Sequence, residues 1–319
     1  MHATYERPGF DLSDPAEIRR VIREGYENGL EAAKAGKPAD YIPELAKADG
    51  SDLGICVLGP EGGPISFGEV EKRFSIQSIS KVINLAAALK FIGFRETFSH
   101  VGMEPTGDAF NSIIKLDTVS DKPFNPMINA GAIQVASMLT NVTDFDGMLE
   151  FARALCMDGD IVLNEAVYRS EFETGDRNRA IAYILRSKGV LQGDPGKTLD
   201  LYFKMCSLNV NAQSLARMGL LIANNGKNPE TGKHLLDPGY VRTIKSLMFT
   251  CGMYDESGEF GVRVGLPSKS GVGGGIVSAV TGRWGIGVYG PALNEKGNSA
   301  GGIAALQHIS HLLKLNVFR

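Results

Sequence analysis

Gln77-Ser78-Ile79-Ser80-Lys81 leads directly into a strongly apolar run, Val82 to Leu89, which Gly93 closes. The run predicts a buried helix, so Ser78 and Lys81, three positions apart, should share one face at its start. A serine hydroxyl is a weak nucleophile until a neighbouring base removes its proton. A lysine that burial keeps neutral can be that base. The stretch therefore predicts a nucleophile and its base, both anchored to the core.

A four-residue pattern such as S-x-x-K also occurs by chance, and a second match is present at Ser112-Ile113-Ile114-Lys115. No long helical run follows that match, so it predicts a loop or a short helical turn. The first match has a possible partner downstream, Lys269-Ser270-Gly271, which leads into a glycine-rich apolar stretch ending at Val280. S-x-x-K at a helix start, combined with K-[ST]-G before a strand, resembles the signature of β-lactamases and penicillin-binding proteins.

Composition narrows the class of protein. The chain has 319 residues, which is enough for one large domain or two small ones. Its formal net charge is only -3. No basic block indicates nucleic acid, and no apolar run is long enough to span a membrane. The first residues also lack the hydrophobic core of a signal peptide. The 4 cysteines stand singly in apolar surroundings, which predicts buried free thiols in a reducing cytoplasm and no metal site.

Strand signals cluster at both ends of the chain, with a mostly helical block between them. The predicted strands are Leu53–Leu58, Pro64–Glu69, Phe260–Leu266, Gly274–Val280 and Trp284–Tyr289. The predicted helices include Ile18–Lys34 near the start and Gly301–Leu313 near the end. The simplest assembly is one sheet built from both ends, with the helical block as a second lobe. A cleft between the two lobes would bring Ser78 and Lys269 together.

Three other motifs have simpler explanations. Gly297-Asn298-Ser299-Ala300-Gly301 matches a nucleophile elbow, but no strand directly precedes it. Asn298 or Ser299 is therefore predicted to be the N-cap of the last helix. The segment 193–198 is predicted to be a turn before a helix, since it lacks the first glycine of a phosphate loop. His308 and His311 share a helix face without an acidic or thiol ligand nearby in sequence, which favours surface or interface histidines over a metal site.

Two polar stretches in the helical block allow a structural and a functional interpretation. The charge-dense run from Ser170 to Asn178 is typical of a solvated helix and loop with internal ion pairs. The apolar run from Asn125 to Ala132 contains Asn129 beside Ala-Gly-Ala, which suggests a buried amide with closely packed backbone. A buried amide needs hydrogen-bond partners, and spacing alone leaves a structural partner and a ligand equally open.

Together, these stretches resemble the serine-dependent glutaminases of bacterial type, which belong to the β-lactamase-like superfamily. The matching segments follow the family's order over nearly the whole chain after its first few dozen residues. They are 41–46, 77–81, 101–105, Phe110-Asn111, 125–133, Ser170-Glu171, 175–178, 199–207, 251–255, 269–272 and 297–299. The resemblance implies an α+β, β-lactamase/transpeptidase-like fold with a mainly antiparallel sheet, flanking helices and an inserted helical lobe at about 94–225. It also implies an N-terminal segment 1–23 and a single catalytic domain 24–315.

The implied reaction is hydrolysis of the γ-carboxamide of L-glutamine to L-glutamate and ammonia through a serine acyl-enzyme, without a cofactor or metal. The resemblance makes Ser78 the nucleophile and Lys81 the base. The residues at the family's glutamine-binding positions are Tyr41, Gln77, Ser78, Asn129, Glu171, Asn178, Tyr202, Tyr254 and Val272. Tyr254 is the first choice for relaying a proton to the leaving nitrogen, and Tyr202 the second. Family members often form dimers or tetramers, which implies a homodimer or homotetramer.

Each implied role is chemically coherent. Glu171 can pair with the α-ammonium of a free amino acid, and Asn129, Asn178 and Tyr41 can donate hydrogen bonds to its α-carboxylate. The N–H groups of Ser78 and Val272 would form the oxyanion hole.

Two alternatives remain on the same fold: a β-lactamase or D-Ala-D-Ala peptidase, and a non-catalytic amino-acid sensor. The segment Ser207-Leu208-Asn209 fits the second motif of the β-lactamases. Glutaminases are instead expected to use tyrosines. Retention of both Ser78 and Lys81 argues against a sensor.

Overall fold

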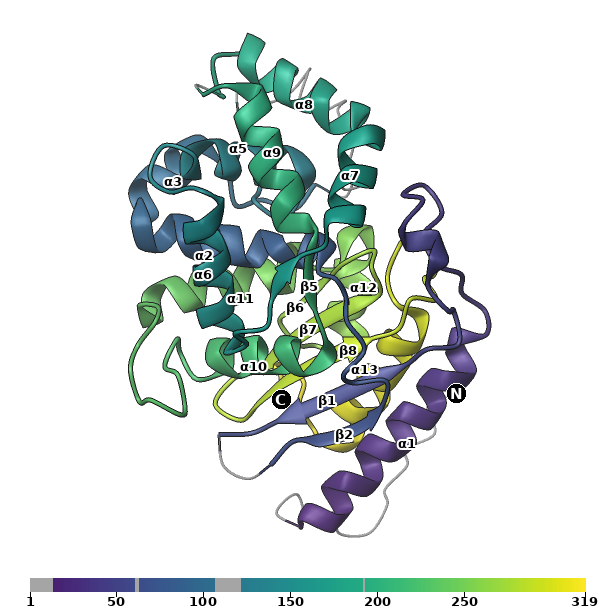
Figure 1. The fold of residues 1–319 in the computed structure, drawn as a ribbon. Coiled ribbons are helices and arrows are strands. Elements are labelled where there is room, and N and C mark those ends of the chain that lie inside the picture. The colour runs from purple at the N-terminus through teal and green to yellow at the C-terminus, as the bar shows by residue number, and fades with distance from the viewer. Residues whose placement is uncertain (1–13, 61–62, 107–121, 192) are drawn as a thin grey trace.

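The protein is represented by a computed structural model, which describes residues 14–60, 63–106, 122–191 and 193–319. Phe110, Asn111 and the second S-x-x-K match lie outside the described residues. The remaining chain folds into a five-stranded sheet with helices on both faces and a helical lobe beside it (Figure 1). Both features agree with the α+β architecture expected from the sequence.

The large sheet is antiparallel throughout, in the order β2-β1-β8-β7-β6. Its strands are β1 (Gly54–Leu58), β2 (Ile65–Gly68), β6 (Ser268–Ser270), β7 (Gly275–Val280) and β8 (Trp284–Tyr289). β1 pairs directly with β8, so Gly54 lies opposite Tyr289. Strands from the two ends of the chain therefore meet at the centre of one sheet, as the sequence predicted.

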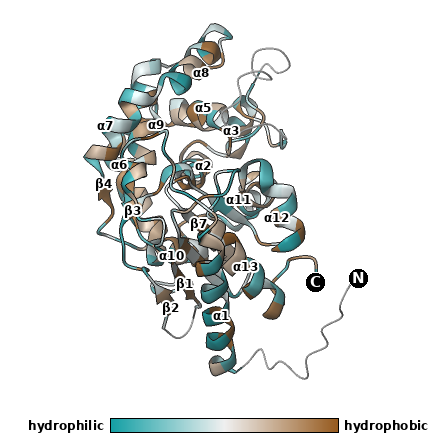
Figure 2. Cartoon of the chain, turned by 90° about the vertical axis from the view of Figure 1, so that its right-hand side faces the viewer, coloured by the Kyte–Doolittle hydropathy of each residue, from teal (hydrophilic) through white to brown (hydrophobic). Residues whose placement is uncertain are grey.

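Alternate residues of the sheet enter two different hydrophobic clusters, as the period of two in a strand requires. Ile55 and Ile276 face the cluster that contains α1 (Pro15–Ala33) and α13 (Ala300–Leu312). Cys56 and Val277 face the cluster that contains α10 (Ala212–Ala223). Figure 2 shows mostly hydrophilic residues along the visible side of α1, consistent with a helix that covers one outer face.

Two glycines of β8 let α10 pack directly on the sheet. A Cβ on Gly285 would lie 2.0 Å from the Ala216 carbonyl oxygen, and one on Gly287 would lie 1.9 Å from that of Ala212. α10 therefore packs directly on β7 and β8.

The helical lobe stands on one side of the sheet (Figure 1). Its helices are α3 (Phe94–His100), α5 (Asn129–Leu139), α6 (Phe145–Cys156), α7 (Glu165–Thr174), α8 (Asp176–Ser187) and α9 (Pro195–Cys206). α2 (Ser80–Phe91) is buried along nearly its whole length and packs against α5, α6 and α11 (Pro238–Cys251). A three-stranded sheet of β3 (Phe74–Ser75), β5 (Leu208–Val210) and β4 (Val162–Leu163) lies below the lobe. The sequence did not predict this sheet.

One predicted strand is wrong. Residues 260–266 were expected to form a strand, but Ser257–Arg263 form helix α12. Phe260, Val262 and Val264 alternate along the chain, yet Val262 is 82% exposed while Phe260 and Val264 are buried. An i, i+4 pair facing the core is the helical pattern, and the regular alternation concealed it.

The simpler explanations of the other motifs are confirmed. The Ser299 side chain accepts a hydrogen bond from the Gly302 N–H and caps α13. Asp194 caps α9, so the segment around it is a turn before a helix. His308 lies against Glu24 and Asn28 of α1.

The described residues also bear on the expectations about membrane spans, metal sites and cysteines. Within them, no helix is long and apolar enough to cross a bilayer, and no three His, Cys, Asp or Glu side chains form a group that could hold a metal. All 4 cysteines are free and buried. Helix α1 runs across the expected boundary between residues 23 and 24, and the division of the chain into segments stays a prediction.

Candidate active site

Ser78 and Lys81 lie together at the junction of a short 3₁₀ turn, Gln77–Ile79, and α2. The Lys81 Nζ is 3.1 Å from the Ser78 Oγ and 2.7 Å from the Asn129 Oδ1, both within hydrogen-bond distance. Lys81 is 1% exposed and Ser78 is 7% exposed. The spacing in the sequence therefore produces the expected contact between a hydroxyl and an amine.

The surroundings of Lys81 favour its neutral form. Burial lowers the pKa of this amine to about 8, and the nearby Cys206 and Glu171 oppose only part of that effect. With this pKa, roughly a tenth of the Lys81 amines are unprotonated at pH 7, far more than for an ordinary lysine with a pKa of about 10.4. Lys81 can accept the proton of Ser78 without a metal ion or a histidine.

The Lys269-Ser270-Gly271 triplet packs against the same turn. A Cβ on Gly271 would lie only 2.7 Å from the Ile76 carbonyl oxygen, so glycine allows the backbone of β6 to approach. The buried Lys269 amine donates a hydrogen bond to the Ser270 carbonyl at 2.6 Å and lies 4.4 Å from the centroid of the Tyr254 ring. Burial, together with repulsion from Lys81, holds the pKa of Lys269 well below its usual range.

A pocket opens beside Ser78 and contains most of the residues expected to bind substrate. The expected residues that line it are Tyr41, Gln77, Ser78, Asn129, Glu171, Asn178, Tyr202 and Val272. The sequence missed other lining residues, which are Ile42, Thr174, Gly175, Arg177 and Cys206. Arg177 stands within the matched segment 175–178, but its residue type and spacing did not distinguish it from an exposed ion-pair partner.

Glu171 supplies a buried acid to this pocket from α7. Burial raises the pKa of its carboxyl to about 7, while a hydrogen bond from the Gln77 amide and the nearby Lys81 lower it in part. Gln77 has a φ of 51°, a left-handed conformation that is strained for a residue other than glycine. Such strain, next to Ser78, is typical of functional sites.

The buried Asn129 amide has two protein partners. Its oxygen accepts a hydrogen bond from Lys81, and its nitrogen donates one to the Asn178 Oδ1 at 3.0 Å. The side chain thus connects Lys81 on α2 with the start of α8. The amide therefore has structural partners, and one of them, Asn178, also lines the pocket.

Three tyrosines lie close to the site: Tyr254 contacts Ser78, and Tyr41 and Tyr202 line the pocket. Burial raises the pKa of Tyr254, while hydrogen bonds from the Ser78 side chain and the Val272 N–H lower it in part. Tyr202 is buried in α9, and Tyr41 lines the pocket although its side chain is 55% exposed. Burial also raises the pKa of both of these phenols. All three phenols are therefore proton donors at neutral pH, and Tyr254 is the one in contact with Ser78.

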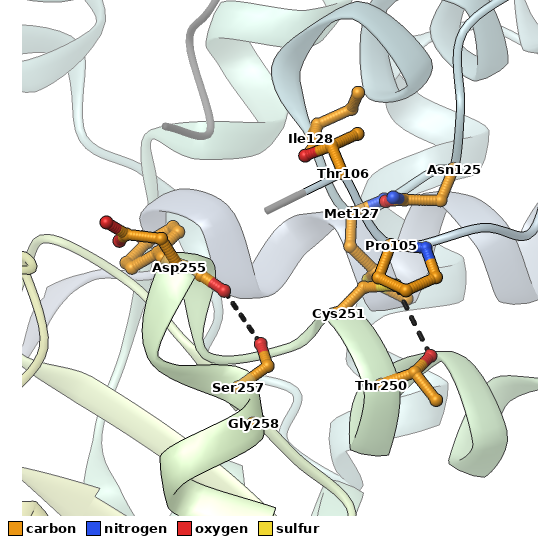
Figure 3. A pocket seen from close by; sticks show the side chains of 11 residues that line it. Pro105, Thr106, Asn125, Met127, Ile128, Thr250, Cys251, Asp255, Ser257 and Gly258 are labelled. Atoms are coloured by element: carbon orange, nitrogen blue, oxygen red, sulfur yellow. Dashed lines mark hydrogen bonds between the residues drawn. The ribbon is translucent and has the colours of Figure 1, made fainter. Parts of the chain in front are cut away.

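A second cavity, lined in part by Tyr254, lies between the start of α5 and the α11–α12 connection (Figure 3). Its wall includes Asn125, Met127, Cys251 and Tyr254, but none of Ser78, Lys81 or Glu171. The hydroxyl of Ser257, another lining residue, donates a hydrogen bond to the Tyr254 carbonyl at 2.8 Å. The pocket beside Ser78 is therefore the candidate substrate site, and this cavity is its neighbour.

The chemistry open to this arrangement is acyl transfer to a serine activated by lysine. An α+β fold in which an S-x-x-K turn meets a K-S-G strand is the arrangement that defines the β-lactamase-like class of proteins.

Comparison with known proteins narrows the class. The glutaminase family model matches residues 36–318, so the chain belongs to the glutaminase family. Glutaminase 2 of Clostridium perfringens is 50% identical over 305 residues, covering 94% of this chain and 100% of that protein. The glutaminase of Clostridioides difficile is 49% identical over 303 residues, covering 93% and 98%.

Solved structures agree. The probable glutaminase ybaS has a TM-score of 0.91 at 36% identity, covering 96% of this chain and 99% of that one. A probable glutaminase from Bacillus subtilis, complexed with 6-diazo-5-oxo-L-norleucine, has a TM-score of 0.85 at 36% identity, covering 99% and 100%. The expected family, β-lactamase-like fold and glutaminase function are thereby confirmed.

Proposed function

We propose that the glutaminase reaction of this chain runs through an acyl-enzyme on Ser78, with Lys81 as the base and L-glutamine bound in the pocket beside them. The observation that carries the proposal is the 3.1 Å contact between the Lys81 amine and the Ser78 hydroxyl. The ligand of the Bacillus subtilis neighbour supports the choice of substrate, because 6-diazo-5-oxo-L-norleucine is a glutamine analogue with a reactive γ-position.

Recognition of the substrate begins with Glu171. A buried carboxylate is costly unless it is paired, and its raised pKa of about 7 expresses that cost. The α-ammonium of glutamine is a matching cation, so binding stabilises the ionised carboxylate. Tyr41, Asn129 and Asn178 lie in the same pocket and supply donors for the α-carboxylate. The two charged groups on the α-carbon are thus held in place, which directs the γ-amide toward Ser78.

The chemical step uses groups around the nucleophile. Lys81 takes the hydroxyl proton as the Ser78 Oγ attacks the amide carbon, and the N–H groups of Ser78 and Val272 stabilise the oxyanion. One such donor contributes roughly 3 kcal/mol to transition-state stabilisation. Tyr254, or in its place Tyr202, passes the proton to the departing ammonia. Water, activated by Lys81, then hydrolyses the γ-glutamyl ester to glutamate.

Labelling with 6-diazo-5-oxo-L-norleucine, followed by peptide mass spectrometry, tests the nucleophile. We expect one adduct, on the peptide that contains Ser78, and none in Ser78→Ala. That variant should still bind glutamine but release no glutamate in a coupled assay, run beside asparagine. An adduct on another side chain, or normal turnover by Ser78→Ala, would contradict the proposal. Rapid nitrocefin hydrolysis without glutamine turnover would favour the β-lactamase alternative.

We also propose that the chain works in the cytoplasm as a homodimer or homotetramer. The free thiols support a reducing compartment, and the assembly rests on the likeness to the family. Sedimentation of the purified full chain tests the assembly, since a monomer at assay concentration would contradict it. Fractionation of the source cells tests the location.

A further inference from the structure

We infer that Cys206 is a positioning residue, whose thiol connects the Tyr202 hydroxyl in the pocket wall to the turn that carries Ser78 and Lys81. The inference deepens the proposed function and rests on it. Cys206 is the last residue of α9 and lines the substrate pocket. Tyr202 stands four residues earlier on the same helix, the spacing at which two side chains meet.

The sulfur contacts both sides of this junction. It lies 3.7 Å from the Ser80 Oγ at the first residue of α2, and it also hydrogen-bonds the Tyr202 hydroxyl. α9 itself packs against the Gln77–Ile79 turn. A single side chain therefore joins the helix that carries Tyr202 to the helix that carries Lys81.

The thiol form suits this place electrostatically. Burial, reinforced by the charge of Glu171, raises the pKa of Cys206 to about 12, so no negative charge forms there at neutral pH. A thiolate at the same point would stabilise the protonated form of Lys81 and oppose its action as a base. Cys206 is accordingly not a second nucleophile.

Sulfur also suits this place geometrically. A sulfur-to-oxygen separation of 3.7 Å is a usable contact, whereas the same separation between two oxygens is too long for a hydrogen bond. A serine at 206 could still reach Tyr202 along its own helix, but its shorter side chain would lose Ser80. Alanine would lose both partners.

The experiment measures kcat and KM for glutamine in Cys206→Ala and Cys206→Ser, alone and combined with Tyr202→Phe. We expect Cys206→Ala to lower kcat/KM about tenfold, mainly by raising KM, as the loss of a polar contact would. Cys206→Ser should recover part of this loss. In the Tyr202→Phe background, Cys206→Ala should change kcat/KM less than twofold, because the hydroxyl it positions is already absent.

Cys56→Ala is the matched control, since Cys56 is an equally buried thiol in β1 outside the pocket. It should lower the melting temperature and leave kcat and KM unchanged. An equal loss from Cys206→Ala in both Tyr202 backgrounds, or no loss in either, would overturn the inference. Failure of the wild-type chain to turn over glutamine, or an adduct away from Ser78, would instead overturn the proposed function.

Discussion

The groups that we propose to react and the acid and amide that we propose to recognise the substrate, Glu171 and Asn178, come from two different regions. The Ser78–Lys81 turn, Lys269 on β6 and Tyr254 lie where α2 meets the edge of the sheet. Glu171 and Asn178 come from the helical lobe, on α7 and α8. This difference predicts that substitutions can impair the chemical step and substrate binding separately, because the two depend on different segments.

The two regions also differ in how tightly their backbone is constrained. At the reacting side, Gln77 and Tyr254 hold φ angles of 51° and 56°, and Gly271 closes on Ile76 with no room for a Cβ. Strained positions persist only where the surrounding packing enforces them. Glu171 and Asn178 stand in ordinary helices on either side of Gly175. The positions of Glu171 and Asn178 thus depend on how α7 and α8 pack, whereas the positions of the groups around Ser78 depend on close backbone packing.

The largest loss of activity should come from a substitution next to Ser78. Lys81→Ala removes the only amine that contacts the Ser78 hydroxyl within the described residues, so we expect kcat to fall by about 10⁴-fold. Glutamine affinity should change only a few-fold. Glutamate release and calorimetric binding measure the two quantities. Lys90→Ala, at an exposed position of the same helix, is the control, and near-normal turnover by Lys81→Ala would break the division of roles.

Glu171→Gln should show the opposite behaviour. Removing the charge that faces the α-ammonium should raise KM about 100-fold, the range for truncating one partner of a buried charge pair, with kcat within a few-fold. Glu173→Gln, at an exposed position of the same helix, should leave KM unchanged. Unchanged glutamine affinity in Glu171→Gln would refute the recognition role.

The pH dependence of kcat/KM should show two ionisations, one from Glu171 in the helical lobe and one from Lys81 beside Ser78. The pKa of Glu171 is raised to about 7 and that of Lys81 is lowered to about 8. Both groups must be unprotonated in the free enzyme, so kcat/KM should rise more than tenfold as the pH increases from 6 to 8. In Glu171→Gln only the step near pH 8 should remain. A flat profile over this range would show that neither group governs activity.

The smallest effect on activity should come from the sheet beneath both regions. Gly287→Ala places a methyl group 1.9 Å from the Ala212 carbonyl oxygen, which should cost about 2–3 kcal/mol of unfolding free energy. The activity of the molecules that remain folded should not change. Gly159→Ala, where a Cβ meets nothing within 4 Å, is the control. Urea denaturation and active-site titration separate stability from catalysis, and a loss of kcat in folded Gly287→Ala would link the sheet to the chemistry.

How much could be predicted from the sequence depended on the length of each pattern. The strands β7 and β8 and the apolar run of α2 gave clear signals, so the sheet and the meeting of Ser78 with Lys81 were predictable. β3 and β4 have only 2 residues each, too few for a period to show. The alternation of Phe260, Val262 and Val264 predicted a strand where a helix forms, because exposure of Val262 is decided by tertiary packing.

The pocket was predictable only in part, for a related reason. Ser78 and Lys81 are neighbours in the chain, and the likeness to a family supplied the distant binding residues. Arg177 and Cys206 reach the same pocket through the packing of α8 and α9. Both lie in segments that match the family, but their residue types alone did not mark them as pocket residues. The close packing of α10 on the sheet was likewise not predictable from its own residues, because the glycines that admit it belong to another element, β8.

The pairing of β1 with β8 has a consequence for biosynthesis. While the chain emerges from the ribosome, the β1–β2 hairpin must wait for its central partner until β8 (Trp284–Tyr289) has been translated. Its open edge is available to other nascent chains during that interval, and contacts so distant along the polypeptide form slowly. Catalytic competence should therefore arrive late and all at once, when the closing strand draws Val272 and Lys269 against the serine turn.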